Sequence, residues 1–191
     1  MFVLRSIKKI KRVLMTYYYS RVFGSIGKNC DIETLISFSG GENIIIGDNV
    51  RIASHTWLSA INFCNQECKL IIENGAIIGH FNHIFATKLI KIEHDVLIAD
   101  KVYISDNMHN YENVLVPICK QPIKQLSPVI IGSGSWIGEN VCIIGSSIGK
   151  HCVIGANAVI TKDIPDYCVA VGAPAKVIKR YDFTENRWKN E

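Results

Sequence analysis

Long hydrophobic segments are absent from the sequence of 191 residues. No apolar run approaches the ~18 residues that a membrane-spanning helix needs. No small-residue cleavage site follows an apolar core near the N-terminus, so a signal peptide is not predicted either. A dense basic face is also missing, since 21 Lys and Arg stand against 17 Asp and Glu and give a formal charge of only +4. This balance argues against direct nucleic-acid binding.

CxxC pairs are absent too, although the sequence contains seven cysteines. Cys64 and Cys68 lie four residues apart, but no second pair and no His-x-x-x-His motif follows to complete a zinc site. We therefore expect no metal and interpret the cysteines as free buried thiols of a protein in a reducing cytoplasm. The chain length and the apolar content of 48% indicate one globular domain with a substantial core.

An amphipathic helix is predicted for residues 1–22. Its apolar residues are spaced by four, three, four and three positions and form a seam of Val3, Ile7, Ile10, Leu14 and Tyr17. The basic residues beside or opposite this seam are Lys8, Lys9, Lys11 and Arg12. Two interpretations stay open: the helix packs on the main domain or on a sister subunit, or residues 1–19 rest on an anionic membrane surface.

From Ile26 onward, aliphatic residues recur at every sixth position. The groups are Ile26 and Ile32; Ile46, Ile52 and Leu58; Ile72, Ile78 and Ile84; Ile92, Ile98 and Ile104; Ile131, Ile137 and Ile143; and Ile148, Ile154 and Ile160. Gly, Glu or Ala commonly follows the aliphatic residue, and a small residue or Val lies four positions after it. A period of six fits neither an amphipathic helix nor an alternating strand, so it indicates a repeat architecture.

Each hexad can supply one short strand and one turn. The aliphatic residue points inward, the small residue fills the space beside it, and Gly or Asn tolerates the backbone of the bend. Three hexads suit a triangular coil whose neighbours cover its apolar row. We therefore predict an all-β domain of stacked coils over residues 23–180, with a loop insertion over residues 109–128. The tail of residues 181–191 is expected to be a brief helix or a frayed end.

The hexad pattern resembles that of the hexapeptide-repeat acyltransferases over residues 24–180. It is most specific from Ile92 to Lys179, where the sequence is similar to the galactoside, maltose and polysaccharide O-acetyltransferase branch. The resemblance implies a left-handed parallel β-helix, a homotrimer, and clefts between subunits that bind acetyl-CoA and the acceptor. The handedness rests on the resemblance alone, because parallel crossovers are right-handed in ~98% of cases.

His109 stands where the loop insertion begins, after the hexads of Ile98 and Ile104. In the O-acetyltransferases that the sequence resembles, a histidine at this point is the general base. Imidazole suits this task because it titrates near neutrality, and an alcohol has to lose its proton as it attacks a thioester. Asp106 is expected to orient the imidazole or to bind acceptor hydroxyls, with a cap on its own turn as the alternative. Asn82 and His83 resemble an acceptor-binding part of the family, one coil earlier.

Ser135-Trp136-Ile137-Gly138 matches the WIG motif of the family. There the Trp forms a wall of the cleft, and the backbone from Gly138 onward contacts the pantetheine or the thioester. The alternative for Trp136 is a stacking position between subunits.

The segment that ends at Pro165 resembles the coenzyme-binding part of the family. The resemblance implies a close backbone approach at Ala156 and contacts of Thr161 and Lys162 with pantetheine and phosphates. Lys176 closes the terminal G-x-P-A-K motif, and with Lys179 it fits the anionic phosphates of coenzyme A.

The resemblance and the residues together predict a trimeric, cytoplasmic, acetyl-CoA-dependent O-acetyltransferase. Its acceptor would be a sugar hydroxyl in the synthesis of a bacterial surface polysaccharide or O-antigen, near the inner face of the plasma membrane. N-acetylation of an amino sugar or its nucleotide conjugate is the first alternative. A non-catalytic or carbonic-anhydrase-like β-helix is the second, although the sequence shows no well-spaced histidine triad for zinc.

Overall fold

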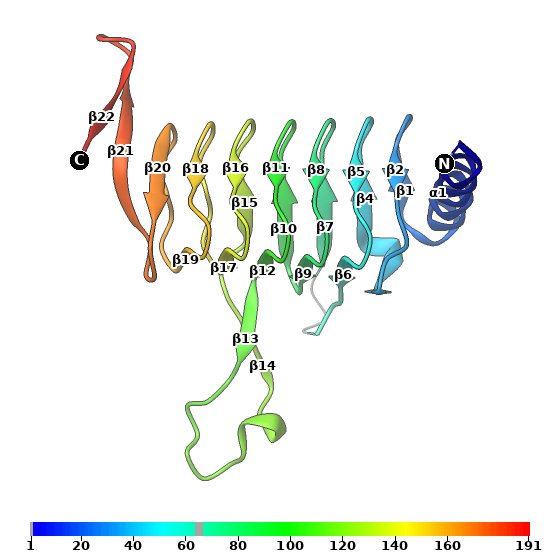
Figure 1. The fold of residues 1–191 in the computed structure, drawn as a ribbon. Coiled ribbons are helices and arrows are strands. Elements are labelled where there is room, and N and C mark those ends of the chain that lie inside the picture. Colours follow the sequence, from blue (N-terminus) through cyan, green and yellow to red (C-terminus); the bar gives the residue numbers. More distant parts are fainter. Residues whose placement is uncertain (1, 64–66) are drawn as a thin grey trace.

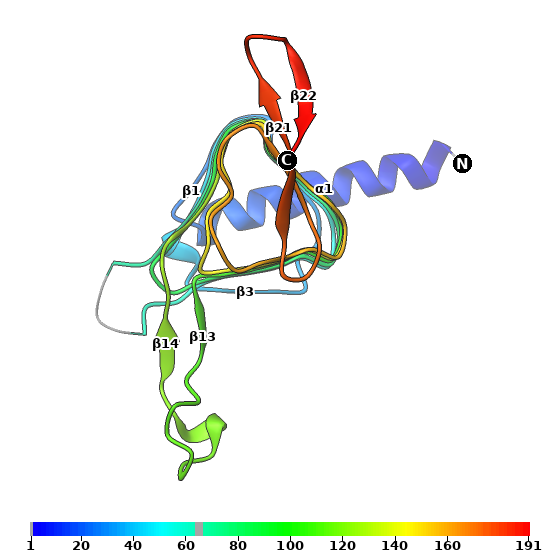
Figure 2. The same ribbon diagram turned by 90° about the vertical axis from the view of Figure 1, so that its left-hand side faces the viewer.

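Three flat sheets surround one apolar core and form a three-sided prism, as the computed structural model shows (Figure 1, Figure 2). The structure describes residues 2–63 and 67–191, and for residues 2–9 and 11 it describes the backbone alone. One helix, α1 (Phe2–Val22), precedes the sheets. Within the described residues, no helix has the length and apolar character needed to cross a membrane.

Each of the first five turns of the chain adds one strand to each sheet, and the later turns meet sheet A only through the isolated bridges of Ile148 and Ile164. Sheet A consists of β1 (Ser25–Ile26), β4 (Ile44–Ile46), β7 (Lys69–Ile72), β10 (Leu89–Ile92) and β15 (Val129–Ile131). Sheet B consists of β2 (Asp31–Ile32), β5 (Arg51–Ile52), β8 (Ile77–Ile78), β11 (Leu97–Ile98), β16 (Trp136–Ile137), β18 (Val153–Ile154), β20 (Cys168–Val171), β21 (Lys176–Asp182) and β22 (Arg187–Asn190). Sheet C consists of β3 (Ser37–Ser39), β6 (Trp57–Ala60), β9 (His83–Ala86), β12 (Tyr103–Ser105), β17 (Cys142–Ile144) and β19 (Val159–Ile160).

Parallel pairing joins the strands of successive coils, and this confirms the predicted all-β fold of stacked coils. Three parallel sheets around one core are the arrangement typical of a left-handed parallel β-helix. A short 3-10 helix, η1 (Gly41–Asn43), lies between β3 and β4. A two-stranded ribbon of β13 (Asn107–His109) and β14 (Ile123–Gln125) leaves the prism, and η2 (Ile118–Lys120) lies between its strands (Figure 1).

The aliphatic residues of period six stack in register inside the prism. Three rows are formed by Ile72, Ile92 and Ile131 in sheet A, by Ile78, Ile98 and Ile137 in sheet B, and by Ile84, Ile104 and Ile143 in sheet C. All nine side chains are at most 1% exposed. Full burial of an aliphatic side chain contributes roughly 1.5–3 kcal/mol, so these rows are the main source of the stability of the fold.

A bend with left-handed backbone lies three positions after many of the aliphatic residues. Asn140 and Asn157 have φ of 62° and 61°, as the prediction of Gly or Asn at the bend requires. Phe81 and Tyr167 occupy the same conformation with φ of 58° and 57°, although bulky residues rarely adopt it. The regular stacking therefore imposes the bend even where the local residue disfavours it.

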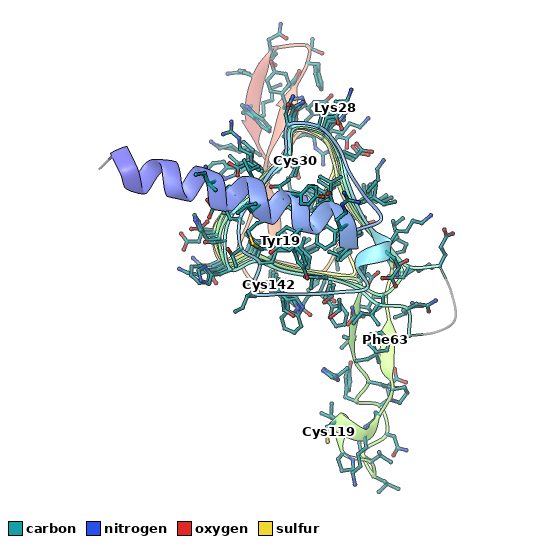
Figure 3. The ribbon with its side chains drawn as sticks, turned by 90° about the vertical axis from the view of Figure 1, so that its right-hand side faces the viewer. Tyr19, Lys28, Cys30, Phe63, Cys119 and Cys142 are labelled. Carbon is teal, nitrogen blue, oxygen red and sulfur yellow. The ribbon has the colours of Figure 1, made fainter. Side chains whose placement is uncertain are left out.

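Helix α1 covers the first coil and accepts hydrogen bonds from backbone N–H groups of that coil. The Thr16 hydroxyl accepts a hydrogen bond from the Ile32 backbone N–H at 3.1 Å, and the Tyr19 hydroxyl accepts one from the Leu35 N–H at 2.9 Å. Tyr19 is 2% exposed, and Figure 3 shows it over the end of the prism. A helix across a sheet end removes an edge at which another chain could pair.

The predicted seam of α1 does not pack on the sheets of its own chain. Ile10, Leu14 and Tyr17 are 60%, 61% and 59% exposed, because Thr16 and Tyr19 on the opposite side of the helix make the contacts with the prism. The side chains of Val3 and Ile7 lie outside the described residues.

The expected helix or frayed end at residues 181–191 is wrong, because β21 and β22 form an antiparallel hairpin there. Tyr181 pairs with Trp188 across the two strands, and their rings lie 5.4 Å apart. The Asp182 carboxylate accepts hydrogen bonds from the Thr184 and Glu185 N–H groups at 2.8 and 3.0 Å and so fixes the turn. Cross-strand aromatic pairs and a capped turn together favour a hairpin over a helix.

Candidate functional site

The three edges of the prism carry most of the residues singled out from the sequence. We call them the A–B, B–C and C–A edges after the sheets that meet there. The B–C edge includes residues 79–82, 99–102, 138–141 and 155–158, and the C–A edge includes residues 87–88, 106–128, 145–147 and 161–163.

Asp106 anchors the ribbon at the C–A edge. It is 0% exposed, and its two carboxylate oxygens accept hydrogen bonds from the Thr87 N–H and hydroxyl at 2.7 and 2.9 Å and from the Lys88 and Leu89 N–H groups at 2.7 and 2.8 Å. The Asn107 side-chain amide donates to it as well, at 3.3 Å. The carboxylate is therefore fully engaged inside the prism, and its predicted roles toward the imidazole and the acceptor stay predictions.

Further hydrogen bonds fix the base of the ribbon. The Gln125 side-chain amide donates to the Thr87 carbonyl at 2.8 Å, and the Leu126 N–H donates to the Asp106 carbonyl at 2.7 Å. The Ser105 hydroxyl donates to the Asn107 carbonyl at 2.8 Å. The sequence analysis missed these anchoring residues, since no repeat signal marks a hydroxyl or amide that bonds across coils.

His109 is the last residue of β13 and is exposed to solvent. It lies opposite Ile123 of β14, three residues beyond the buried Asp106. Farther along the loop, the Gln121 side-chain amide donates to the Asn113 and Val116 carbonyls at 2.9 and 2.8 Å. The imidazole is thus carried by an ordered ribbon that stands out from the prism (Figure 2).

Asn82 is a structural residue of the B–C edge. Its side-chain amide donates to the Gly79 and Ala99 carbonyls at 2.9 and 3.0 Å, and its oxygen accepts from the Val102 N–H at 2.7 Å. At 1% exposure it has no polar group to offer an acceptor. The side chain thus joins two coils, and its predicted role in acceptor binding stays a prediction.

His83 lies on the outer face of sheet C within an aromatic column. Its ring stacks on Trp57 with centroids 4.2 Å apart and planes inclined by 7°, and it meets the edge of Tyr103 at 5.3 Å. Burial lowers the pKa of His83, because the charged form loses hydration there. Within the described part of the chain its buried Nε2 has no hydrogen-bond partner.

Trp136 belongs to an apolar column on the outer face of sheet B. It lies beside Leu97 of β11, which lies beside Ile77 of β8, and the three side chains are 50%, 43% and 41% exposed. Water therefore reaches one side of the indole. A flat apolar strip of this kind suits a wall of a binding cleft or a contact between subunits.

Gly138 and Ala156 meet at the B–C edge, on neighbouring coils. The Gly138 N–H donates to the Ile154 carbonyl at 2.8 Å, and a Cβ added at Gly138 would lie 2.7 Å from the Ala156 nitrogen. Any larger residue at 138 would push the coils apart. Ala156 is exposed, so its backbone can be approached from outside.

Thr161 and Lys162 are exposed at the C–A edge, directly after β19. The backbone that leads to Lys176 lies against the same strand, since the Ala175 N–H donates to the Val159 carbonyl at 2.9 Å. Lys176 and Lys179 are exposed on β21. Within the described residues, none of the three lysines forms an ion pair, so their charges are available to an anion.

The predicted site residues fall into two groups on one chain. His109, Thr161 and Lys162 share the C–A edge, and the strands that precede them, β12 and β19, are separated only by β17. Two strand spacings correspond to about 10 Å along the prism. Trp136, Gly138 and Ala156 lie instead on sheet B and the B–C edge, on the other side of sheet C. One chain alone therefore does not bring the two groups into one cleft.

The cysteines that the structure describes are free, as predicted. Burial raises the pKa of Cys68 to about 12 and that of Cys152 to about 11, so both thiols stay protonated. Cys68, Cys152 and Cys168 are buried, whereas Cys30 and Cys142 are half-buried and Cys119 is exposed (Figure 3). Cys64 lies outside the described residues. Among the described side chains, no cluster of three His, Cys, Asp or Glu could hold a metal ion.

The fold and the repeats together define a hexapeptide-repeat protein. A family model described as "Hexapeptide repeat of succinyl-transferase" matches residues 128–162. The putative lipopolysaccharide biosynthesis O-acetyl transferase WbbJ of Escherichia coli is 30% identical over 190 residues, which cover 96% of this chain and 92% of that protein. The galactoside O-acetyltransferase of the same organism is 31% identical, with 87% of this chain and 68% of that protein covered. The chain belongs to the hexapeptide-repeat acetyltransferase family.

Two further likenesses agree with this family. The probable acetyltransferase Rv3034c of Mycobacterium tuberculosis is 37% identical over 158 residues, which cover 81% of this chain. The chain spans about half, 49%, of the length of that relative. Among solved structures, AntD of Bacillus cereus, an N-acyltransferase in complex with dTDP and 3-hydroxybutyryl-CoA, superposes with a TM-score of 0.75 over 90% of each chain. Its sequence identity of 21% makes this a likeness of the fold.

The variant Asp106→Asn is expected to lower the free energy of unfolding by about 3 kcal/mol. The side-chain amide of Asn has one oxygen that accepts hydrogen bonds, whereas both carboxylate oxygens of Asp106 accept them. Backbone N–H groups of the C–A edge would therefore be left unpaired in the interior. Urea unfolding followed by circular dichroism measures this change. The control is Asp163→Asn, an exposed residue that accepts only the Ser147 N–H at 2.7 Å, which an amide oxygen can also accept. Equal losses in both variants would contradict the role assigned to Asp106.

The free energy of unfolding is expected to fall as the pH is lowered from 7 to 5. Because the pKa of His83 is lowered in the folded protein, the unfolded chain takes up the proton first, from about pH 6.5 downward, and is favoured. One such group contributes at most about 1.4 kcal/mol per pH unit. His83→Gln should flatten this dependence in urea unfolding measured across the range, whereas the exposed His94→Gln should keep it. An unchanged slope in His83→Gln would refute the assignment.

Proposed function

We propose that this chain is an acetyl-CoA-dependent O-acetyltransferase with a sugar hydroxyl as its acceptor. One observation carries the proposal. His109 stands on an anchored ribbon at the same edge of the prism as Thr161 and Lys162. The coil that carries the titratable His109 and the coil that carries Lys162, which is suited to bind a phosphorylated donor, thus lie about 10 Å apart along this edge. Membership in the hexapeptide-repeat acetyltransferase family supports this interpretation.

His109 acts as the general base in this proposal. Its imidazole takes the proton from the acceptor hydroxyl while the oxygen attacks the carbonyl carbon of the thioester. The carbon–sulfur bond then breaks, and the coenzyme A thiolate leaves and recovers the proton from the imidazolium. The role of Asp106 in this scheme is indirect, because its buried carboxylate fixes the base of the ribbon that carries His109.

The donor would lie along the prism with its phosphates toward the C-terminal end. Lys162, Lys176 and Lys179 are exposed there and suit phosphate as point charges. Gly138 and Ala156 permit a close approach of the pantetheine arm to the backbone, and Thr161 can bond to it. Trp136 offers an apolar wall on sheet B.

We propose a homotrimer with one active site between each pair of subunits. The support is the distribution of the candidate residues over two edges of one chain. If the B–C edge of a second copy lies along the C–A edge of the first, Trp136, Gly138 and Ala156 of one face His109 of the other. This contact joins two different surfaces, and such a contact gives a closed ring when its rotation returns to the first copy; closure after three copies would form three equivalent sites.

A surface polysaccharide or O-antigen is the acceptor class that we favour, with synthesis in the cytoplasm. WbbJ, a relative whose match covers 96% of this chain, is described as a putative lipopolysaccharide biosynthesis O-acetyl transferase. His83 is the proposed direct acceptor contact, and the buried Asn82 and Asp106 are proposed to support the acceptor site by holding neighbouring coils together. The segments 38–45, 59–71 and 110–128, where the six-residue repeat of the sequence is interrupted, are proposed to determine which sugar is bound.

His109→Ala is expected to lower the rate of acetyl transfer by about 10²- to 10⁴-fold, because the general base is lost. The assay measures release of coenzyme A from acetyl-CoA with a panel of paired sugar and amino-sugar acceptors. His94→Ala, which alters an exposed histidine at the A–B edge, should retain activity. Full activity of His109→Ala would refute the mechanism. A preference for the amine acceptors would contradict O-acetylation and support N-acetylation.

Mixed trimers of two inactive variants test the location of the site. Trp136→Ala and His109→Ala, expressed together, should recover activity at about a quarter of the sites if each site takes one residue from each of two copies that mix at random. The separately expressed variants, mixed at the same concentration without subunit exchange, provide the control. Mixed trimers confirmed by mass but without recovered activity would place both residues in the same subunit.

A further inference from the structure

The positive charge of the protein is concentrated in helix α1. Residues 1–22 contain six Lys and Arg and no Asp or Glu, so they carry +6, whereas the whole chain carries +4. The rest of the chain therefore carries −2. Arg12 pairs with Asp31 and Glu33 at 3.2 and 3.0 Å, and the helix together with these two carboxylates still carries +4. The segment is a strongly cationic end on an otherwise slightly acidic protein.

An apolar stripe lies on the side of α1 that faces away from the prism. It consists of Ile10, Val13, Leu14 and Tyr17, which are 60%, 62%, 61% and 59% exposed. We call these residues the outer stripe. The opposite side of the helix carries Thr16 and Tyr19, whose hydroxyls bond to the first coil. Because this second stripe holds the helix in place, the outer stripe is not needed for the fold.

The position of the helix determines which partner can reach the outer stripe. Helix α1 lies across the end of the prism, and its N-terminal half extends past the outline of the coils (Figure 2, Figure 3). The outer stripe therefore faces away from the coils, beyond the end of the molecule. A subunit that packs side by side against the sheets lies beside the prism, so it does not cover this surface.

We propose that the outer stripe docks on an anionic lipid bilayer. The apolar side chains would enter the boundary between headgroups and acyl chains, and the net positive charge of the helix would attract the anionic headgroups. Tyr17 and the neighbouring Tyr18, 49% exposed, are amphipathic rings of the kind that favours the headgroup level. The prism would then stand on the membrane with its axis upright and its ribbon parallel to the surface.

Charge distinguishes the bilayer from a second copy of this chain. Two molecules that met end to end through their outer stripes would bring two strongly cationic helices together, and like charges oppose such a contact. A bilayer that contains anionic lipid attracts the same helix. In the trimer of the proposed function, three helices would lie at one end, so three weak contacts would act together and strengthen binding.

Vesicle co-flotation of the full chain tests the proposal. Vesicles of phosphatidylcholine and phosphatidylglycerol in equal parts should bind the protein, and vesicles of phosphatidylcholine alone should bind it much less. Ile10→Ser combined with Leu14→Ser should weaken binding about tenfold or more, because two apolar side chains no longer leave water. Added salt should also release the protein from the anionic vesicles, because it screens the attraction.

The matched control combines Val114→Ser with Leu115→Ser. These side chains are 91% and 89% exposed on the loop between β13 and β14. Their replacement by Ser should leave vesicle binding unchanged. Equal binding of the wild type and the outer-stripe variant would overturn the proposal, as would equal loss in the control. A wild type that floats with neither vesicle but doubles its mass in ultracentrifugation through the outer stripe would assign this surface to a second copy. Acetyl transfer is not part of this readout, so its outcome is independent of the proposed activity.

Discussion

The packing of three aliphatic side chains per coil inside the prism is the constraint on which the structure depends. Rows such as Ile78, Ile98 and Ile137 stay aligned only if every coil brings its strands into the same register. An insertion within a strand would turn the following side chains to the wrong face. Extra residues can therefore leave only at an edge, and the ribbon with His109 does so at the C–A edge. The site residues are confined to edges and outer faces for this reason.

The two ends of a regular stack have to be covered. The loop of residues 106–128 has to be fixed to the stack as well. Helix α1 covers the first coil with hydroxyl groups that accept from its free N–H groups. The last coil continues into the antiparallel hairpin of β21 and β22. At the loop, the buried Asp106 accepts from the backbone of the neighbouring coil and so ties an irregular segment to a regular one.

The period of six made the coils and their core predictable, because one aliphatic residue per hexad is a direct consequence of the geometry. The position of His109 at the start of the loop was predictable for the same reason, since a break in the period is visible in the sequence. The roles of Asp106 and Asn82 were not. A polar side chain looks the same in the sequence whether it faces a substrate or bonds across coils, and only the neighbouring coil distinguishes the two. The hairpin was missed because the repeat stops before Tyr181, and its aromatic pairing depends on residues seven positions apart.

The equal spacing of the coils fixes the distances along the prism between residues on different coils. Strands of successive coils lie about 4.8 Å apart. The separation along the prism between the coils that carry His109 and Thr161 can therefore change only by multiples of this spacing. Gaining or losing a coil between β12 and β19 would move His109, the proposed base, by one strand spacing relative to Thr161 and Lys162. Small adjustments are left to the ribbon and its side chains. In the proposed site, the number of coils would therefore set the length of the donor that fits, whereas the loops would set the shape of the acceptor.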